Sequence, residues 1–357
     1  ASLPSFVPKG TKMGFERCDQ THHPVAHLHG GGEREEAFVR TPSGEGVGRN
    51  GGQALRFGVV TGFPERDPSS RSLLRACARL GSAQALAPAS IRVEVGEATR
   101  LLFGDERPED FDVLLLLRGL GPGGDSEVQL LAYRLLEEGG TLVLNSLDSL
   151  LSAQDKLRTS AVLAKAGIPT PPAMTIQRAS DLSAAFERLG SPLIVKPQWG
   201  SLGEGVELLG GDSAGRARAE ELLQRSGSLY LQRYVEHGGR DLRLFVVGNE
   251  VEAAMERRAP EGEVRTNWQV GGSAVEIEVE DRLSKIAIGA AEALGLDWAG
   301  IDLALGPEGP TVIEVNGSPG WEGIALTTKK DMGEAIARHA ARRANESKEI
   351  MARLEGG

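Results

Sequence analysis

The chain has 357 residues, 40% of them hydrophobic and 25% charged, which is a globular composition at a length that predicts two or three domains. Its formal net charge of −10 argues against broad binding to nucleic acid or to an anionic membrane surface. Its two cysteines form no disulfide framework or metal motif, no aliphatic run could span a bilayer, and no secretory pattern opens the sequence, so we expect a cytoplasmic protein.

Residues 1–54 differ from the rest of the chain in composition. They are rich in glycine, proline, histidine and charged residues, and they show no sustained hydrophobic period. This composition favours a solvated, disordered extension. A metal-binding tail is the alternative, because four of the six histidines lie here: His22, His23, His27 and His29.

Residues 55–150 alternate expected strands with expected helices. The continuous apolar run at 111–118 is typical of a strand buried inside a parallel sheet. The alternation therefore predicts a small parallel sheet covered by helices. Strands are expected from residue 55 and at 91–95, 111–118 and 141–145, and helices at 70–80 and 128–138.

The segment from Gly119 to Gly124 matches the dinucleotide-binding pattern G-x-G-x-x-G between a strand and a helix. Two features disfavour an NAD site. Pro122 removes a backbone N–H from the turn, and the strand end about twenty residues further on is Asn145, which lacks the acid that would hold a ribose. An NAD-dependent enzyme is therefore the weaker alternative.

Residues beyond 150 mix helices with antiparallel hairpins, which predicts an α+β organisation. A helix at 152–166 is expected to end at A-G-I-P-T-P-P, where glycine and then prolines stop it. Hairpins are expected at 241–258, turning at Gly248-Asn249, and at 299–316. The remaining expected elements are strands at 191–197 and 229–235, helices at 181–189, 213–225 and 282–294, and a helical C-terminal end.

Lys196 lies in the apolar strand P-L-I-V-K-P, and the glycine-rich loop G-S-L-G-E-G follows at 200–205. A lysine in such a strand either extends its ammonium group to the sheet edge or meets an anion. Glycines allow backbone N–H groups to approach a ligand closely. A point charge beside such a loop predicts a triphosphate site, although the sequence has neither a Walker loop nor a protein-kinase signature.

Acidic and amide side chains gather on the hairpin 299–316. Asp302 is central in its first strand, whereas Glu314 and Asn316 share one face of the second, because alternate residues of a strand point to the same side. Asp302 and Glu314 can therefore lie side by side. Close carboxylates repel each other unless a cation bridges them, and oxygen ligands suit Mg²⁺. A solvated hairpin face is the alternative.

Basic residues close the other hairpin. Arg257 and Arg258 end its second strand, and Arg265 and Asn267 follow shortly. Paired arginines can bind a carboxylate or a phosphate with two hydrogen bonds each, and surface salt bridges are the alternative. Lys156, in A-Q-D-K-L-R-T, is expected to begin a helix.

The order of these motifs resembles the ATP-grasp superfamily, and their detail resembles its RimK-type branch of ATP-dependent glutamate ligases. The resemblance covers residues 55–340. It is carried by D-K-L-R-T, P-L-I-V-K-P, G-S-L-G-E-G, A-G-I-D, E-V-N-G-S-P-G-W-E-G-I and, most specifically, D-L-R-L-F-V-V-G-N-E-V-E-A-A-M-E-R-R-A-P-E-G-E-V-R-T-N-W.

The resemblance implies α/β and α+β regions in one chain: a Rossmann-like N-terminal (pre-ATP-grasp) domain, then a two-subdomain ATP-grasp fold that grips ATP. It also implies a reaction. ATP phosphorylates a carboxylate to an acyl phosphate, and an amine attacks it to give an amide or peptide bond, ADP and phosphate. The implied divisions are 1–54 (extension), 55–150 (N-terminal domain), 151–235 (central subdomain with the glycine lid), 236–345 (C-terminal subdomain with the metal site) and 346–357 (tail).

The resemblance also assigns roles to particular residues. Those implied to bind ATP are Lys156, Lys196, Gly200, Ser201, Gly203, Gly205, Gln232, Arg233, Tyr234, Val235, Asp241, Arg265, Thr266 and Asn267. Those implied to bind two Mg²⁺ or Mn²⁺ ions are Asp302, Glu314 and Asn316. Those implied to act in catalysis are Arg258, which would hold the anionic intermediate, Lys196 and Asn316, and those implied to contact substrate are Arg118, Arg257, Ser318, Gly320 and Glu322.

Two departures from the family bear on specificity. Arg233 stands at a linker position that is usually acidic, which puts the base preference in doubt. The glycine loop differs from that of RimK itself and is nearer to relatives that extend pterin-type cofactors, which leaves the acceptor open.

We therefore predict an acid–amino-acid ligase that adds L-glutamate, or another amino acid, to a carboxylate-bearing acceptor such as a protein C-terminus, a peptide or a cofactor tail. A homo-oligomer, either a dimer or a tetramer, is expected, without nucleic-acid or membrane partners. A non-catalytic ATP-binding regulator on the same fold is the further alternative.

Overall fold

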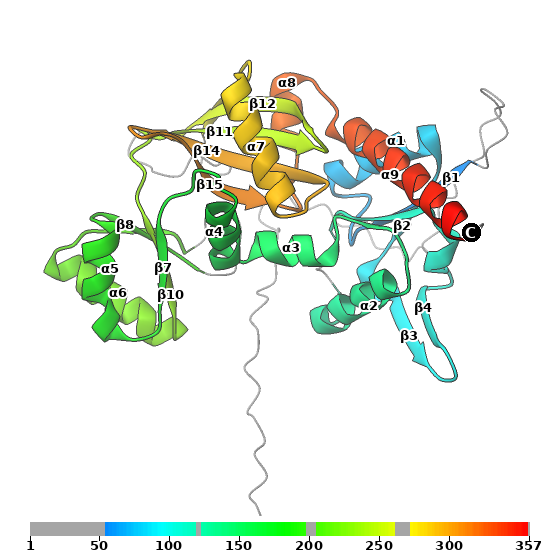
Figure 1. The fold of residues 1–357 in the computed structure, drawn as a ribbon, viewed down its shortest axis with the longest axis horizontal. Coiled ribbons are helices and arrows are strands. Elements are labelled where there is room, and N and C mark those ends of the chain that lie inside the picture. The colour runs from blue at the N-terminus through cyan, green and yellow to red at the C-terminus, as the bar shows by residue number, and fades with distance from the viewer. Residues whose placement is uncertain (1–53, 119–122, 198–204, 261–271, 356–357) are drawn as a thin grey trace, which may run out of the picture. The chain divides into compact units, whose positions relative to one another are not determined.

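The computed structural model describes residues 54–118, 123–197, 205–260 and 272–355. The chain from Leu55 onward forms one compact unit. It contains both helices and sheets, and this mixed content was predicted (Figure 1). Within the described residues, no helix is long and apolar enough to cross a membrane.

The first sheet is parallel, as the alternation of strands and helices predicts, and its order is β2-β1-β5-β6. The strand β2 was not predicted, because its small and polar residues carry no alternating or β-branched pattern. The strands are β1 (Leu55–Val60), β2 (Gly81–Leu86), β5 (Val113–Leu116) and β6 (Val143–Leu144).

The predicted strand at 91–95 exists, but its expected place in the parallel sheet is wrong. It is β3 (Ile91–Val95), and it pairs antiparallel with β4 (Thr99–Phe103) in a separate two-stranded sheet. The alternation I-R-V-E-V suits an exposed hairpin better than a strand buried on both faces, which is why the parallel sheet uses β2 instead.

Two helices that connect strands of the parallel sheet begin at aspartate caps. They are α1 (Pro68–Leu80), capped by Asp67, and α2 (Ser126–Glu138), capped by Asp125. Such a carboxylate accepts hydrogen bonds from amides that have no partner within the helix, and it complements the helix dipole. Two short 3₁₀ helices are η1 (Pro88–Ser90) and η2 (Pro108–Asp110).

The single helix predicted at 152–166 is in fact two, α3 (Leu147–Gln154) and α4 (Lys156–Lys165). Asp155 ends α3 and caps α4, where its Oδ1 accepts hydrogen bonds from the backbone N–H groups of Leu157 at 2.9 Å and Arg158 at 3.1 Å. An aspartate that binds the backbone in this way competes with a continuing helix. The break makes Lys156 the first residue of α4, as expected.

The second sheet is antiparallel, with the order β7-β10-β8-β9. Residues alternate between its faces, so Val195 and Leu231 pack against helices, whereas Lys196 and Gln232 point to the other side. Its elements are β7 (Ala173–Ile176), η3 (Ala179–Asp181), α5 (Leu182–Leu189), β8 (Leu193–Lys196), β9 (Glu207–Leu209), α6 (Ser213–Ser226) and β10 (Leu229–Arg233).

The third sheet is also antiparallel, with the order β13-β12-β11-β14-β15, and it contains both predicted hairpins. The helix α7 (Asp281–Ala293) packs on one face, against Leu242, Leu244 and their neighbours. The opposite face carries Asp241, Arg243 and Asp302. The strands are β11 (Arg240–Val247), β12 (Glu250–Arg258), β13 (Ser273–Glu276), β14 (Trp298–Gly306) and β15 (Gly309–Asn316).

The chain ends in α8 (Glu322–Thr328) and α9 (Met332–Glu355), and α9 lies beside α1 (Figure 1). One hydrophobic cluster includes Phe57 of β1 and Leu73 of α1 together with Phe245 of β11 and Ile336 of α9. Segments far apart in the sequence therefore share one core.

Asn145 joins the parallel sheet to the third sheet. Its side chain is fully buried, and its Nδ2 donates to the carbonyl oxygens of Trp298 at 2.9 Å and Gly317 at 2.8 Å. Its Oδ1 accepts from the backbone N–H of Asp297 at 2.6 Å. The residue considered above for a ribose contact is therefore used to connect strands.

Candidate active site

The predicted acidic cluster forms where β14 pairs with β15. Asp302 lies directly opposite Glu314, and Gly300 lies opposite Asn316. The Oδ1 of Asn316 accepts a hydrogen bond from the backbone N–H of Ser318 at 2.9 Å, which fixes the amide orientation. The hairpin thus brings together the three oxygen-bearing side chains that the sequence analysis assigned to metal.

Two lysines lie close enough to this hairpin to interact electrostatically with Glu314. Lys196 Nζ donates to Gln232 Oε1 at 2.8 Å and lies 3.4 Å from the carbonyl oxygen of Ile313, next to Glu314 in β15. Although part of the Lys196 residue is exposed, burial of its ammonium group lowers its pKa to about 8. Burial also lowers the pKa of Lys156. The structure therefore places two desolvated cations beside an acidic pair, which is suited to an anionic ligand.

A buried network of two acids and two arginines adjoins the hairpin. Arg257 donates from Nε to Asp241 Oδ1 and from Nη2 to Asp241 Oδ2, each at 2.7 Å, and its Nη2 lies 2.9 Å from Asp302 Oδ2. Arg243 Nε lies 2.8 Å from Asp302 Oδ1. Burial alone would lower the pKa of Arg257, but Asp302 and Asp241 raise it above its ordinary value. The two positive charges of the arginines balance the two negative charges of the aspartates.

The geometry at Asp302 fits a divalent cation. The residue is 3% exposed, and within the described part of the chain its Oδ1 has no hydrogen-bond partner, because the nearby Arg243 Nε is not aligned for one. The Arg243 guanidinium group balances the charge of this oxygen but gives it no aligned hydrogen bond, so Oδ1 keeps acceptor capacity that a divalent cation can use. Glu314 and the amide oxygen of Asn316, which can accept at two sites, supply further oxygen ligands of the kind that Mg²⁺ prefers.

The two neighbouring arginines of β12 lie in opposite environments. The Arg257 side chain is 8% exposed and belongs to the buried network, whereas the Arg258 side chain is 57% exposed and its Nε lies 2.6 Å from Glu256 Oε1. Successive residues of a strand point to opposite faces, so the two cannot act as a pair. The structure therefore does not bring Arg258 together with the acidic hairpin.

Arg243 is a site residue that the sequence analysis did not single out. It lies two residues after Asp241 in D-L-R-L, on the same face of β11, and directly opposite Asp302. Gly300 leaves room for it, since a Cβ atom there would lie 2.2 Å from Arg243 Nη1. The alternation of β11 would have revealed the position.

Arg118 brings the parallel sheet to the substrate residues predicted after β15. Its Nη1 donates to the carbonyl oxygen of Ser318 at 2.7 Å, and its Nε lies 3.5 Å from Asp67 Oδ2 at the start of α1. A Cβ on Gly320 would lie 3.3 Å from Arg118 Nη2. Arg118, Ser318 and Gly320 are thus neighbours, whereas Glu322 is exposed in the first turn of α8.

The predicted linker residues lie at and after the end of β10. Arg233 Nε donates to the carbonyl oxygen of Leu189 at 3.1 Å, so its side chain turns toward α5. Tyr234 has a tilted ring contact with His237, and Val235 lies close to Gly306. Gly205 has a φ of +67°, which few other residues adopt.

Some predicted residues lie outside the described part of the chain. They are Gly200, Ser201, Gly203, Arg265, Thr266 and Asn267, together with residues 119–122 of the NAD-like glycine run. Within the described residues, no three His, Cys, Asp or Glu side chains form a group that could hold a metal ion.

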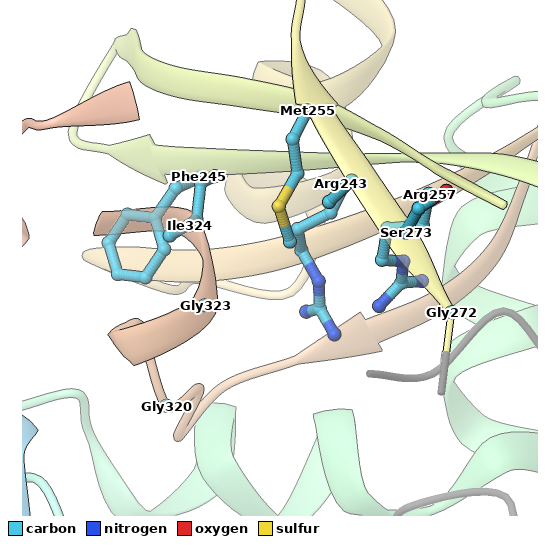
Figure 2. Close-up of a pocket in the computed structure, with 10 residues that line it drawn as sticks. Arg243, Phe245, Met255, Arg257, Gly272, Ser273, Gly320, Gly323 and Ile324 are labelled. Carbon is cyan, nitrogen blue, oxygen red and sulfur yellow. The ribbon is translucent and has the colours of Figure 1, made fainter. Parts of the chain in front are cut away.

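A pocket of about 150 Å³ opens beside the buried network (Figure 2). It is lined by strands β11, β12 and β13 on one side and by α8 and the segment before it on the other. Its lining residues are Arg243, Phe245, Met255, Arg257, Gly272, Ser273, Ala274, Gly320, Gly323 and Ile324.

Comparison with known families identifies the class of protein. A family model described as the RimK-like ATP-grasp domain matches residues 153–340. The chain therefore belongs to the RimK-like ATP-grasp family and is an ATP-dependent ligase of the C–N bond-forming class. The predicted family and the predicted enzyme class, an ATP-dependent ligase that forms C–N bonds, are confirmed.

Individual relatives agree with this assignment. A protein named probable alpha-L-glutamate ligase 2, from Shewanella amazonensis, is 33% identical over 304 residues, covering 82% of this chain and 98% of its own. The ATP-grasp ligase PsnB, solved with a phosphomimetic variant of minimal precursor, Mg and ADP, has a TM-score of 0.64 at 19% identity, covering 82% of this chain and all 100% of its own.

A further solved structure is similar in fold. It is a RimK domain protein from Sphaerobacter thermophilus, with a TM-score of 0.60 at 20% identity over 80% of this chain and 99% of its own. The two structures confirm the ATP-grasp fold.

Proposed function

We propose that the protein is an ATP- and Mg²⁺-dependent carboxylate–amine ligase that adds L-glutamate to a carboxylate-bearing acceptor. The observation that carries the proposal is the pairing of Asp302 with Glu314 across β14 and β15, beside the two desolvated lysines. The names of the alpha-L-glutamate ligases and the Mg and ADP bound to PsnB support the choice of amino acid, nucleotide and metal.

The lysines would bind the phosphates of ATP, and the acidic hairpin would bind the metal ions. Lys156 and Lys196 would contact phosphate oxygens. The negative phosphate charge would compensate for the stabilisation by water that the two ammonium groups lose on burial. Asp302, Glu314 and Asn316 would hold one or two divalent ions, Mg²⁺ or Mn²⁺. The metal would neutralise charge on the phosphates during transfer.

Arg257 and Arg243 are better placed than Arg258 to stabilise an anionic intermediate. Both line the pocket and both contact Asp302, so an anion bound to them lies next to the metal ligands. The planar guanidinium group matches carboxylate and phosphate oxygens. Arg118, held near Ser318 and Gly320, would contact the substrate from the parallel sheet.

The proposed reaction has two steps. A carboxylate oxygen of the acceptor attacks the γ-phosphorus of ATP, the bond from phosphorus to the ADP oxygen breaks, and an acyl phosphate forms. The amino group of glutamate then attacks the acyl carbon, phosphate leaves with the electron pair of the carbon–oxygen bond, and the nitrogen loses a proton. The protein contributes position and charge stabilisation, without a nucleophilic side chain.

The proposal is tested with pure protein, ATP, Mg²⁺, glutamate and a panel of carboxylate acceptors. We expect ADP release together with a mass gain of one glutamate residue on an acceptor. Glu314→Gln and Lys196→Ala should abolish both, whereas Glu308→Gln, an exposed glutamate in the turn of the same hairpin, should change neither.

Turnover by Glu314→Gln at the wild-type rate would contradict the assignment of the metal site. Tight nucleotide binding without ADP release under any acceptor would instead support the non-catalytic regulator. We do not propose NAD-dependent chemistry further, because the family match assigns the chain to the ATP-grasp ligases.

A further inference from the structure

The pocket beside the buried network has one charged end and one apolar end. Arg243 and Phe245 are two residues apart on β11, as are Met255 and Arg257 on β12, so all four point to the same face. Figure 2 shows the arginines on one side, Phe245 and Ile324 on the other, and the Met255 side chain between them.

The size of the pocket suits a single side chain. Its volume is about 150 Å³. A cavity of about 150 Å³ with apolar walls holds a group the size of a benzene ring. The apolar walls are fixed by the core, because Phe245 packs edge-on against Trp321 with ring centroids 5.9 Å apart and Ile324 is buried in α8.

The charged end adjoins the proposed site of phosphoryl transfer. Arg243 and Arg257 both contact Asp302, the metal ligand, and both line the pocket. A carboxylate bound at the arginines therefore directs the carbon chain attached to it toward Met255, Phe245 and Ile324.

We propose that this pocket binds the side chain adjacent to the reacting carboxylate of the acceptor, and that it selects an uncharged, apolar group there. The enzyme therefore adds one glutamate to an acceptor and does not extend its own product. This inference rests on the proposed function, since it names the acceptor class of the same site.

The limit to one addition follows from the negative charge of the glutamate that is added first. After the first transfer, the terminal residue is glutamate, whose side-chain carboxylate would have to enter the apolar end. Burying an unpaired carboxylate costs far more than burying a methyl group gains. The two arginines do not meet it there, because they lie at the opposite end of the pocket, where they contact Asp241 and Asp302.

The test uses three peptides that differ only in their C-terminal residue: leucine, glycine or glutamate. We expect kcat/KM for the leucine peptide to exceed that for the glutamate peptide roughly a hundredfold or more. Mass spectrometry should show a single added glutamate. A ladder of additions, or equal use of the leucine and glutamate peptides, would overturn the inference and leave the ligase assignment standing.

A pocket-filling variant provides a structural test. Gly323 lines the pocket and a Cβ on it would meet no heavy atom within 4 Å, so Gly323→Leu adds bulk at the pocket wall without a backbone clash. It should raise KM for the leucine peptide at least about tenfold while changing kcat/KM for the glycine peptide little. Gly96→Leu, at an equally open position in the β3–β4 turn, is the matched control and should change neither. Equal loss with both peptides would contradict the proposed role of the pocket.

A binding measurement separates the inference from the ligase activity. N-acetyl-leucine and N-acetyl-glutamate are titrated calorimetrically into wild-type protein and Gly323→Leu in the presence of Mg²⁺ and ADP. Preference for N-acetyl-leucine that Gly323→Leu removes supports the pocket even if no ligation is detected, in which case the proposed function fails alone. Equal binding of the two acids, or a preference that Gly323→Leu retains, overturns the pocket.

Discussion

Neighbouring residues on one strand can have opposite energetic roles, as Arg257 and Arg258 show. Arg257 satisfies two buried carboxylates, so its removal leaves charges that have no compensation inside the protein. Arg258 has a single, exposed partner on its own strand, and exposed ion pairs contribute little. The strand geometry therefore decides which arginine matters for stability.

This contrast gives the first prediction. Arg257→Met should lower the free energy of unfolding by about 3–5 kcal/mol, as expected for breaking a buried ion pair, and abolish ligation. Arg258→Met should lower it by about 1 kcal/mol or less and leave most activity. Urea denaturation and ADP release measure both effects. Loss of activity in Arg258→Met at unchanged stability would instead support the catalytic role that the family resemblance implies for Arg258.

The second prediction at the residue scale concerns pH. Burial lowers the pKa of Lys196 to about 8, and bound phosphate favours the charged lysine. Nucleotide affinity should therefore be fully present below this pKa and fall as the pH rises through about 8, by at most about tenfold per pH unit for one proton.

Calorimetric titration of ADP with Mg²⁺ between pH 6.5 and about 9.5 measures the profile. Lys196→Met should bind weakly with a flat profile across this range. Lys285→Met, which removes an exposed lysine of α7, is the control and should retain the wild-type profile. Affinity that stays constant in wild type would show that Lys196 does not contact the phosphates.

At the scale of the elements, the start of α1 combines a helix cap with a functional contact. Asp67 accepts hydrogen bonds from the backbone N–H of Ser70 at 3.1 Å and from its Oγ at 2.6 Å, and it also pairs with Arg118. Asp125 caps α2 in a similar way at an exposed position. The two caps therefore allow the helix effect to be separated from the effect on Arg118.

We predict that Asp67→Ala and Asp125→Ala each lower the free energy of unfolding by about 0.5–2 kcal/mol, the usual cost of losing a cap. Only Asp67→Ala should also raise KM for the acceptor, because Arg118 loses the partner that orients it. Thermal melts and steady-state kinetics provide the two measurements. An equal change in KM for both variants would exclude Asp67 as a positioning residue.

The sequence predicted long, strongly patterned elements well and short ones poorly. The hairpins at β11–β12 and β14–β15 follow from apolar alternation and glycine turns, which also gave the pairing of Asp302 with Glu314. The strand β2 was missed because tertiary pairing with β1, rather than its own residues, makes it a strand. The break between α3 and α4 at Asp155 was not predicted, because an aspartate inside a helical pattern does not by itself indicate a helix cap.

Individual residues of the candidate site were predictable from the sequence, but their burial or exposure was not. Spacing along the strands identified Asp302, Glu314 and Lys196, because these residues interrupt apolar runs. Burial of Arg257 and exposure of Arg258 depend on which face of β12 packs against α8 and which against α7, and that choice comes from packing across the whole sheet. The same packing creates the pocket, which has no local sequence signal.

At the scale of the whole molecule, the compact unit begins at Leu55. We predict that a chain starting at Ala54 keeps its nucleotide affinity and a Tm within roughly 2 °C of the full chain, which for a protein of this size corresponds to about 1.3 kcal/mol. The composition of residues 1–54, without a hydrophobic period, is the reason. A large drop in Tm would show that this segment packs on the rest, and a change in Zn²⁺ binding alone would support the metal-binding tail.

The cluster that unites β1 and α1 with α9 has a consequence for biosynthesis. The ribosome finishes α1 at Leu80, but it reaches the start of α9 only at Met332. At a translation rate of about 5–20 residues per second, the apolar faces of β1 and α1 remain without their partner helix for roughly ten to fifty seconds. The nascent chain therefore exposes hydrophobic surface on β1 and α1 during translation. Binding of a chaperone to this surface should raise the yield of native enzyme.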